Sequence, residues 1–410
     1  MKHIIYQVVS FVLIVSLAAF AAGCAKKDTS STEENTTAAE TRAEVTQGET
    51  TATQAQTVGG TTAAETTKPT AAAATSTVDT ALRQEIINVM KHRSFSGAFR
   101  VSKGGKLLCE GTNGMFSIDG DQPLSLDNRF LIASISKQFC ATCILLLRNE
   151  GKLSLDDTLA KYYPEYARAG DITLKQMLTM RSGIFDYVSN DGSGFDAYIP
   201  YDFSENASED DNHQAVRDWI FSQELLFEPG ERFYYSDSNY FLLAEIVQRI
   251  SGKSYGDVLR ERIFKPLGMN DTGVAEELAH DEKTVPPFFS DKSAPREIYT
   301  IGATFGNGGI ITTVADMDKW LTALRKHTIL DEDSYKEMTT DYSPDDGHYG
   351  YGISLNDDGS LWHEGMADSF ASYALTDPEE ELNVFIVTNN AYARFSEFRG
   401  LVNEILNDVM

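Results

Sequence analysis

The order in which strand-like and helix-like segments follow one another constrains the fold of this chain more than any other feature. An amphipathic segment at 80–93 is followed by two strand-like segments, at 96–101 and 106–111, and strand-like segments return only after residue 349. The stretch between them, about 116–330, has mainly helical spacing of its apolar residues. Because strands need partners, we expect the two ends of the chain to share one antiparallel sheet. The sequence therefore predicts an α+β fold, with terminal helices flanking the sheet and a mostly helical region inserted into it.

Individual elements are expected from the spacing of apolar residues and from turn residues. The helices expected in the inserted region are 137–149, 174–181, 213–223, 241–251, 255–263 and 314–325. The strands expected in the C-terminal part are 349–355, 360–363, 369–375 and 382–388, followed by a closing helix at 396–409. An active site would lie where the sheet and the helical region meet.

The N-terminal residues 1–23 have the pattern of an export signal, with a short basic start, an apolar run and small residues at the end. The sequence Ala21-Ala22-Gly23-Cys24 resembles the lipobox of bacterial lipoproteins, in which the signal is cut before the cysteine and Cys24 carries the lipid. The alternative is a retained transmembrane anchor, because the apolar run is just long enough to span a bilayer. Both alternatives place the rest of the chain outside the cytoplasm, and the first anchors it by lipid to the outer face of the cell membrane.

A change of composition divides the remaining chain. Residues 24–78 are dominated by Thr and Ala and contain no aromatic residue, so they bury too little apolar surface to fold and are expected to form a flexible tether. Residues 79–410 have globular composition and are expected to form one catalytic domain. The formal net charge of −26 excludes a general affinity for nucleic acid.

The strongest candidate for chemistry is the pair Ser134 and Lys137, the only S-x-x-K in the chain. Residues three apart lie on one face of a helix, and apolar runs on both sides of the pair predict that it is buried. Asp127 and Asn128 are expected to start this helix. A serine becomes nucleophilic only when a neighbour takes its proton, which a buried lysine can do. The alternative is a solvated polar face of a helix.

Two further segments carry candidate residues. Tyr235 lies in a loop after Pro229-Gly230, where a phenol could move protons or merely pack. His363 lies on a short strand that is expected to end at Gly365, where the absence of a side chain would let a substrate approach the backbone. The backbone N–H just after Gly365 could form an oxyanion hole with that of Ser134. The alternative for His363 is a structural histidine.

Together these motifs resemble the serine β-lactamase and penicillin-binding-protein superfamily, specifically its class C-like branch, which also contains D-alanyl-D-alanine carboxypeptidases, D-aminopeptidases and esterases. The family order of S-x-x-K, Y-x-N and then K-T-G or H-x-G corresponds to Ser134–Lys137, Tyr235–Asp237 and His363–Gly365. Segments 178–184 and 308–316 resemble two further family motifs. The resemblance covers about 80–410 and implies a β-lactamase/transpeptidase-like fold.

The resemblance also implies a mechanism. Ser134 would be acylated with Lys137 as its base, Tyr235 would pass the proton to the leaving group, and water would release the acyl group. The backbone N–H groups of Ser134 and Met366 would hold the oxyanion. The implied substrates are small D-amino-acid peptides related to peptidoglycan, or esters, and no cofactor or metal is implied.

Departures from the family pattern bear on the substrate. Asp237 replaces the usual asparagine, His363 replaces the lysine of true class C β-lactamases, and Glu364 occupies a position that in the family tends to face the carboxylate of the substrate. Two additional acids at the pocket would repel a carboxylate unless they are protonated or paired elsewhere. We therefore expect a preference for amides or esters with a neutral or cationic group near the scissile bond.

Two other functions remain open at this point. The chain could be a true β-lactamase, or it could be a catalytically silent binding module that keeps an inherited pocket. Cys140 and Cys143 form a C-x-x-C inside an apolar helix and are expected to be core residues. The segment 185–212, which contains Tyr187, is expected to form a rim of the pocket.

Overall fold

The computed structural model describes residues 78–117, 120, 122–188, 208–287, 302–367, 369–391 and 394–410. The expected signal, Cys24, nearly all of the expected tether and the middle of the segment 185–212 lie outside the described residues, so the predictions made for them remain predictions. Among the described residues, no helix combines the length and the apolar character needed to cross a membrane.

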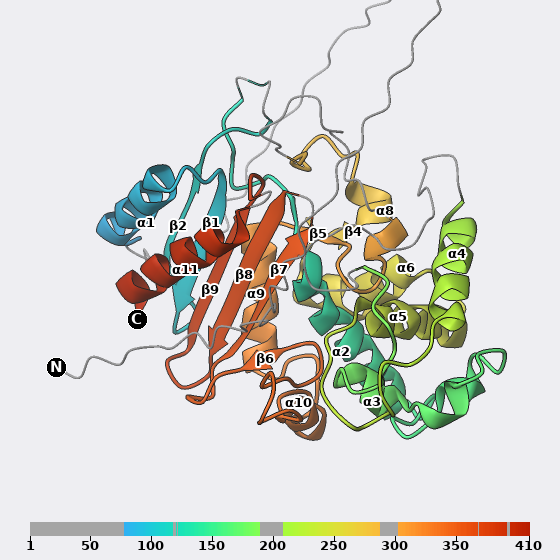
Figure 1. Ribbon diagram of the computed structural model, residues 1–410. Helices are drawn as coiled ribbons and strands as arrows, with labels where there is room; N and C mark the ends of the chain where they lie inside the picture. The colour runs from blue at the N-terminus through green and yellow to red at the C-terminus, as the bar shows by residue number, and fades with distance from the viewer. Residues whose placement is uncertain are drawn as a thin grey trace, which may run out of the picture. The chain divides into compact units, whose positions relative to one another are not determined.

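One antiparallel sheet joins the two ends of the domain, as expected (Figure 1). Its strand order is β2-β1-β9-β8-β7-β6. The strands are β1 (Gly97–Lys103), β2 (Lys106–Asn113), β6 (Ser354–Leu355), β7 (Leu361–Ala367), β8 (Phe370–Asp377) and β9 (Leu382–Thr388). The join is made by β1 and β9, where Gly97 is opposite Thr388. Every residue of β8 and β9 is buried, because both faces of the central sheet are covered.

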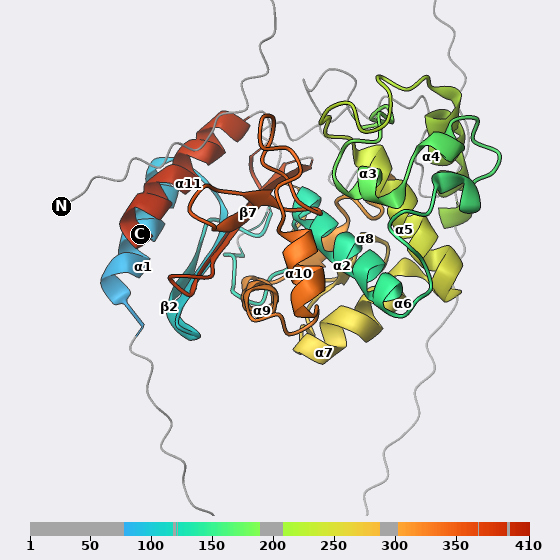
Figure 2. The same cartoon turned by 90° about the horizontal axis from the view of Figure 1, so that it is seen from below.

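Helices from different parts of the chain cover the two faces of this sheet. The terminal helices α1 (Thr80–His92) and α11 (Phe395–Val409) lie side by side on one face, and α9 (Val314–Arg325) packs on the other (Figures 1 and 2). Helix α1 begins at Asp79, whose carboxylate accepts hydrogen bonds from the N–H groups of Ala81 and Leu82 at 3.0 Å. The terminal helices thus enclose a separate apolar core against the outer face of the sheet.

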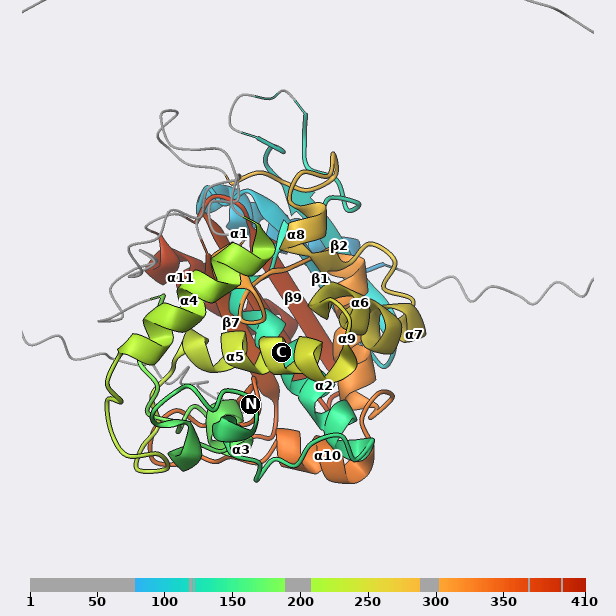
Figure 3. The ribbon, with the colours of Figure 1, turned by 90° about the vertical axis from the view of Figure 1, so that its right-hand side faces the viewer.

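The inserted region is mostly helical, and Figure 3 shows it from the side opposite the terminal helices. Its α-helices are α2 (Ser136–Asn149), α3 (Leu174–Leu178), α4 (Glu209–Ser222), α5 (Asp237–Ser251), α6 (Tyr255–Leu259), α7 (Lys265–Leu267), α8 (Ala275–Leu278) and α10 (Glu332–Met338). Short 3-10 turns are η1 (Ala133–Ile135), η2 (Leu159–Lys161), η3 (Ala169–Asp171) and η5 (Gly302–Thr304), and η4 (Arg260–Phe264) is a π-helical turn. A small antiparallel sheet contains β3 (Phe130–Leu131), β5 (Ile310–Thr312) and β4 (Gly273–Val274). The predicted α+β arrangement is confirmed.

Several predicted boundaries were wrong. The helix expected to begin at Asp127 and Asn128 does not, because Asn128 instead closes a turn by accepting the N–H of Ser125 at 2.7 Å, and strand β3 follows. Within 349–355 only β6 is a strand, and the strand expected at 360–363 continues past Gly365 to Ala367. Helix α5 begins four residues earlier than expected, at Asp237, and residues 209–212 belong to α4 rather than to a loop.

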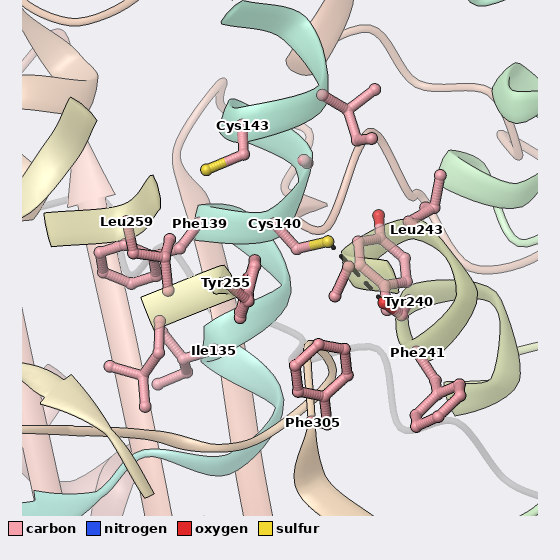
Figure 4. Packing of buried hydrophobic residues seen from close by; sticks show 14 of the residues in the cluster. Ile135, Phe139, Cys140, Cys143, Tyr240, Phe241, Leu243, Tyr255, Leu259 and Phe305 are labelled. Atoms are coloured by element: carbon pink, nitrogen blue, oxygen red, sulfur yellow. Dashed lines mark hydrogen bonds between the residues drawn. The ribbon is translucent and has the colours of Figure 1, made fainter. Parts of the chain in front are cut away.

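The cysteines of the C-x-x-C are core residues, as expected. Cys140 and Cys143 are fully buried on α2, and their thiols point in different directions into an apolar cluster (Figure 4). Cys140 faces the backbone oxygen of Tyr240 at 3.8 Å. Burial raises the pKa of Cys143 to about 12, so this thiol stays protonated and unreactive at neutral pH.

The turn between α10 and β6 packs directly on the backbone of α2, and a glycine makes this possible. Gly352 has φ +71°, and a Cβ there would lie 2.7 Å from the carbonyl carbon and oxygen of Lys137. We expect Gly352→Ala to lower the free energy of unfolding by about 3 kcal/mol or more, because overpacking adds to backbone strain. Gly359→Ala is the matched control, since Gly359 has φ +85° and nothing within 4 Å of its Cβ position. We expect it to cost only about 1–2 kcal/mol. Equal losses in urea unfolding would contradict this packing.

Candidate active site

Ser134 lies in the 3-10 turn η1, at the point where strand β3 leads into helix α2. The preceding residue, Ala133, has φ +47°, a left-handed conformation that is unfavourable for a residue with a side chain. Because this conformation turns the chain sharply from strand to helix, it places Ser134 at the surface of a pocket that it lines together with Asp237, Asn307 and Met366. Ser134 thus lies near the start of a core helix, as expected, although this helix begins at Ser136 and not at Asp127 and Asn128.

Lys137 is fully buried and lies beside Ser134, as its spacing predicted. Its Nζ donates to Ser134 Oγ at 3.0 Å and to the backbone oxygen of Asn307 at 2.9 Å. The same nitrogen lies 2.5 Å from Asp237 Oδ1 in an ion pair. It also lies 4.9 Å from the centre of the Tyr235 ring, within the range of a cation–π contact. The alternative of a solvated polar face is therefore wrong.

Tyr235 faces the same group of residues from the loop before α5. Its hydroxyl is buried and completes no hydrogen bond of good geometry with the described residues. Burial raises the pKa of Tyr235 well above the usual range of a phenol, the charge of Asp237 adds to the rise, and the neighbouring Ser134 hydroxyl opposes it. Tyr235 is therefore a protonated phenol at neutral pH, able to give a proton rather than to take one.

His363 lies on β7, is buried, and is bonded through both ring nitrogens. Nδ1 is 2.5 Å from the backbone oxygen of Glu364, so it carries the hydrogen, and Nε2 accepts from the hydroxyl of Tyr349 at 3.1 Å. Burial, assisted by the charge of Lys137, lowers the pKa of His363 to about 3. The rings of Tyr235, Tyr349 and His363 contact one another, with centroids 5.8–6.3 Å apart. His363 thus brings no positive charge to the pocket.

The edge of β7 approaches the backbone at Ser134 closely, and Gly365 permits this. A Cβ on Gly365 would lie 2.2 Å from the backbone oxygen of Ile132 and 3.0 Å from the nitrogen of Ser134. Ser372 of β8 fixes the same turn by donating to the Ile132 oxygen at 2.7 Å. The N–H of Ser134 and the backbone around Met366 therefore border one space, where the predicted oxyanion hole would lie.

Glu364 does not face the pocket, and the prediction that it would was wrong. Its side chain leaves the opposite face of β7 from His363 and pairs with Arg399 of α11, with 3.0 Å between Glu364 Oε2 and Arg399 Nε. Consecutive residues of a strand point to opposite faces, so the sequence held a signal for this result. Glu364 contributes to docking of the C-terminal helix and presents no charge to a bound substrate.

Two residues near the site were missed in the sequence. Asp186 is buried, and its Oδ1 accepts the backbone N–H of Asp237 at 3.0 Å, which supports the first turn of α5. Burial raises the pKa of Asp186 well above its usual value, and the charge of Asp237 adds to this. Tyr349 was likewise missed, although its position in Tyr349-Gly-Tyr-Gly352 marks a tight turn. Tyr187, expected at the pocket rim, is instead fully buried and accepts from Asn307 Nδ2 at 2.6 Å.

The charge balance of the described site is close to zero. Asp237 is the only charged residue among the described residues that line the pocket, and it is paired with Lys137 behind it. No group of three or more metal-binding side chains occurs in the described part of the chain. A serine hydroxyl, a buried lysine, a protonated phenol and backbone N–H groups surround one small space. These are the groups that acyl transfer through a serine requires.

Comparison with known proteins agrees with this chemistry. A family model described as Beta-lactamase matches residues 82–404. Protein flp of Staphylococcus aureus (strain MW2) is 26% identical over 329 residues, which cover 75% of this chain and 63% of flp. The match thus spans less than two thirds of the length of that relative. PbpX of Bacillus subtilis (strain 168) is 30% identical over 309 residues, covering 72% of this chain and 70% of PbpX.

Solved structures show the same fold. A D-amino acid amidase from Ochrobactrum anthropi SV3, complexed with L-phenylalanine amide, is 25% identical with a TM-score of 0.68, covering 80% of this chain and 99% of the amidase. The octameric penicillin-binding protein homologue from Pyrococcus abyssi is 25% identical with a TM-score of 0.64, covering 76% of this chain and 73% of that one.

The buried neutral state of His363 predicts a loss of stability in acid. A histidine takes up a proton near pH 6.5 when unfolded, whereas in the folded domain the pKa of His363 is about 3. Its contribution to stability is therefore complete above about pH 6.5 and is lost as the pH falls from there towards 3. Between about pH 7.5 and pH 5, we expect the wild type to lose about 2 kcal/mol more than His363→Gln in urea unfolding.

Exposed His92 provides the control, because His92→Gln should keep the pH dependence of the wild type. Parallel pH dependences for the wild type and His363→Gln would contradict the buried neutral state.

Proposed function

This chain belongs to the beta-lactamase family, whose model covers residues 82–404, and from this membership and the geometry of the pocket we propose that it is a serine hydrolase forming an acyl-enzyme on Ser134. The observation that carries the proposal is the 3.0 Å contact between Ser134 Oγ and the buried Nζ of Lys137 in a pocket that Ser134 lines. Oγ would attack the carbonyl carbon of an amide or ester, and the N–H groups of Ser134 and Met366 would hold the oxyanion.

Tyr235 would complete the first half of the reaction. As a protonated phenol beside Ser134 it can give its proton to the departing nitrogen or oxygen, and it recovers a proton from Lys137. Water would then enter and release the acyl group. The proposal needs no metal or organic cofactor.

The substrates we propose are small D-amino-acid amides, D-peptides or esters that carry a neutral or cationic group near the scissile bond. A carboxylate would find no cation among the described lining residues, and of the two basic residues behind them Lys137 is engaged by Asp237 and His363 is neutral. The similarity to a D-amino acid amidase supports substrates of this class. A true β-lactamase, whose substrates carry a carboxylate, is the less favoured alternative.

We also propose that the enzyme acts outside the cytoplasm, held at the membrane by lipid on Cys24 and by the tether. This rests on the sequence pattern of residues 1–78. On this basis the enzyme would meet fragments of peptidoglycan or esters at the cell surface.

Labelling of Ser134 tests the chemistry. The full chain, purified in detergent, should gain the mass of one fluorophosphonate adduct on Ser134, and Ser134→Ala should gain none and lose about 10³-fold or more of its ester hydrolysis. Ser136→Ala, two residues further along at the start of α2, is the matched control, and it should still be labelled. Absence of any adduct on the wild type would favour the silent binding module.

A substrate panel tests the preference for charge. We expect kcat/KM for an uncharged ester or a D-amino acid amide to exceed that for the analogue with an adjacent carboxylate by at least about tenfold, which corresponds to about 1.4 kcal/mol. Acylation by a fluorescent penicillin, which carries a carboxylate, should likewise be at least about tenfold slower than acylation by the uncharged ester. Equal or faster acylation by the penicillin would favour a β-lactamase.

A further inference from the structure

The ammonium group of Lys137 has three oxygen neighbours. Its Nζ donates to Ser134 Oγ at 3.0 Å and to the Asn307 backbone oxygen at 2.9 Å, and it forms an ion pair with Asp237 Oδ1 at 2.5 Å. Because an ammonium has no lone pair, Lys137 cannot take the proton of Ser134 unless it gives one away in the same step. Of its three neighbours, the Asn307 carbonyl is not basic and Ser134 is the group being activated. Only the carboxylate of Asp237 can receive that proton.

The phenol of Tyr235 is not an alternative base. Its raised pKa keeps it protonated, and a protonated phenol can only give a proton at this stage. The neutral His363 uses Nε2 to accept from Tyr349 rather than from Ser134. The proton of Ser134 therefore has one open route among the described residues, through Lys137 to Asp237.

Burial lowers the free energy needed to move a proton from Lys137 to Asp237. The side chain of Lys137 is 0% exposed and that of Asp237 is 11% exposed. An ion pair in such surroundings is poorly solvated, so the neutral amine–acid pair lies closer to it in free energy than it would in water. The titratable groups that face the pair from the elements packed around it are Asp186, Tyr187, Tyr235, Tyr240, Tyr349, His363 and Cys140.

We propose that Asp237 is the terminal proton acceptor of the acylation step, acting through Lys137, a role that rests on the serine hydrolase function proposed above. As the bond forms between Ser134 Oγ and the carbonyl carbon, Nζ of Lys137 passes one of its protons to Oδ1 of Asp237, turns its freed lone pair towards Ser134 and takes the proton of Oγ. The electron pair of the carbonyl moves to the oxyanion. Lys137 is thus an ammonium before and after the step and a neutral amine only in passing, and Asp237 ends the step as a carboxylic acid.

The balance closes when the leaving group departs. The oxyanion re-forms the carbonyl, the bond to the leaving atom breaks, and Tyr235 gives that atom its proton. Lys137 then gives a proton to the phenolate oxygen of Tyr235, and Asp237 returns its proton to Lys137. The net result is one proton moved from Ser134 to the leaving group. An asparagine at position 237 could not take part, because an amide is not basic enough to store the proton.

The pH dependence of acylation tests the role of Asp237. The measurement is the rate at which a fluorophosphonate phosphonylates Ser134 in the full chain between about pH 6 and about pH 10. A P–O bond forms to Oγ as the P–F bond breaks, and the fluoride leaves without needing a proton from Tyr235, so the rate reports only the removal of the Ser134 proton. We expect a nearly flat profile for the wild type. Asp237→Asn should react about 10²-fold more slowly near pH 7, with a rate that rises about tenfold per pH unit. Without the carboxylate of Asp237 no neighbour of Nζ can store a proton, so Nζ can take the Ser134 proton only after it has given one to solvent.

Asp157→Asn is the matched control, because it removes another aspartate–lysine pair, 2.7 Å from Lys161 and outside the pocket lining. It should keep the flat profile of the wild type. A rate for Asp237→Asn that equals or exceeds that of the wild type near pH 7, or a flat profile for this variant, would overturn the proposal, because Asp237 would then only hold the charge of Lys137 in place.

A second measurement needs no variant and remains decisive if Asp237→Asn does not fold. The rate at which the fluorophosphonate labels the wild type in mixtures of H₂O and D₂O should fall along a curve, because two protons move in the rate-limiting step. A straight line, which indicates one moving proton, would overturn the proposal. If Ser134 of the wild type is not labelled at all, both the proposed hydrolase function and the proposed role of Asp237 are wrong. Labelling with a straight line overturns the role of Asp237 alone.

Discussion

The rest of the site depends on how the positive charge of Lys137 is buried. Placing an ammonium in a protein interior costs several kcal/mol unless its donors are satisfied and its charge is compensated. Three separate segments supply the acceptors: the turn with Ser134, the segment with Asn307, and the first turn of α5 with Asp237. Because these segments are far apart in the chain, the requirement to satisfy one nitrogen holds the inserted helical region together around Ser134.

The sheet takes part through close backbone contacts rather than through long side chains. Strand β6 pairs only with Leu361 and Trp362, at the beginning of β7. The remainder of β7 does not pair with β6 and instead packs on the turn that carries Ser134. Gly365 makes this approach possible at the turn, as Gly352 does at the backbone of Lys137. The site therefore lies at the seam between sheet and helices. Gly352 and Gly365 let backbone segments approach there more closely than side chains would allow, and the left-handed conformation of Ala133 turns the chain between them.

The elements and the Ser134–Lys137 contact could be predicted from the sequence because both arise from local spacing: period-2 and helical patterns, and an i, i+3 pair. The convergence of Tyr235 and His363 on this pair came from the family resemblance, not from spacing. The ion pair of Lys137 with Asp237 joins residues 100 positions apart, and no local signal marks it. The orientation of Glu364 was available from strand alternation, but its partner Arg399 lies on a different element. The false helix start at Asn128 arose because the same side chain can cap a turn as well as a helix.

From the sequence, the aspartate that stands at position 237 where the family has asparagine predicts an added charge that repels carboxylates. The structure also gives a preference against carboxylates, but for a different reason. The charge of Asp237 is compensated by its ion pair with Lys137. A carboxylate substrate is therefore neither attracted nor strongly repelled by the pocket. The same pairing gives the serine proton a destination that an asparagine could not provide. One side chain thus stabilises the buried lysine, sets the charge that a substrate meets and offers a path for the proton, so a change at position 237 should alter substrate preference and pH dependence together.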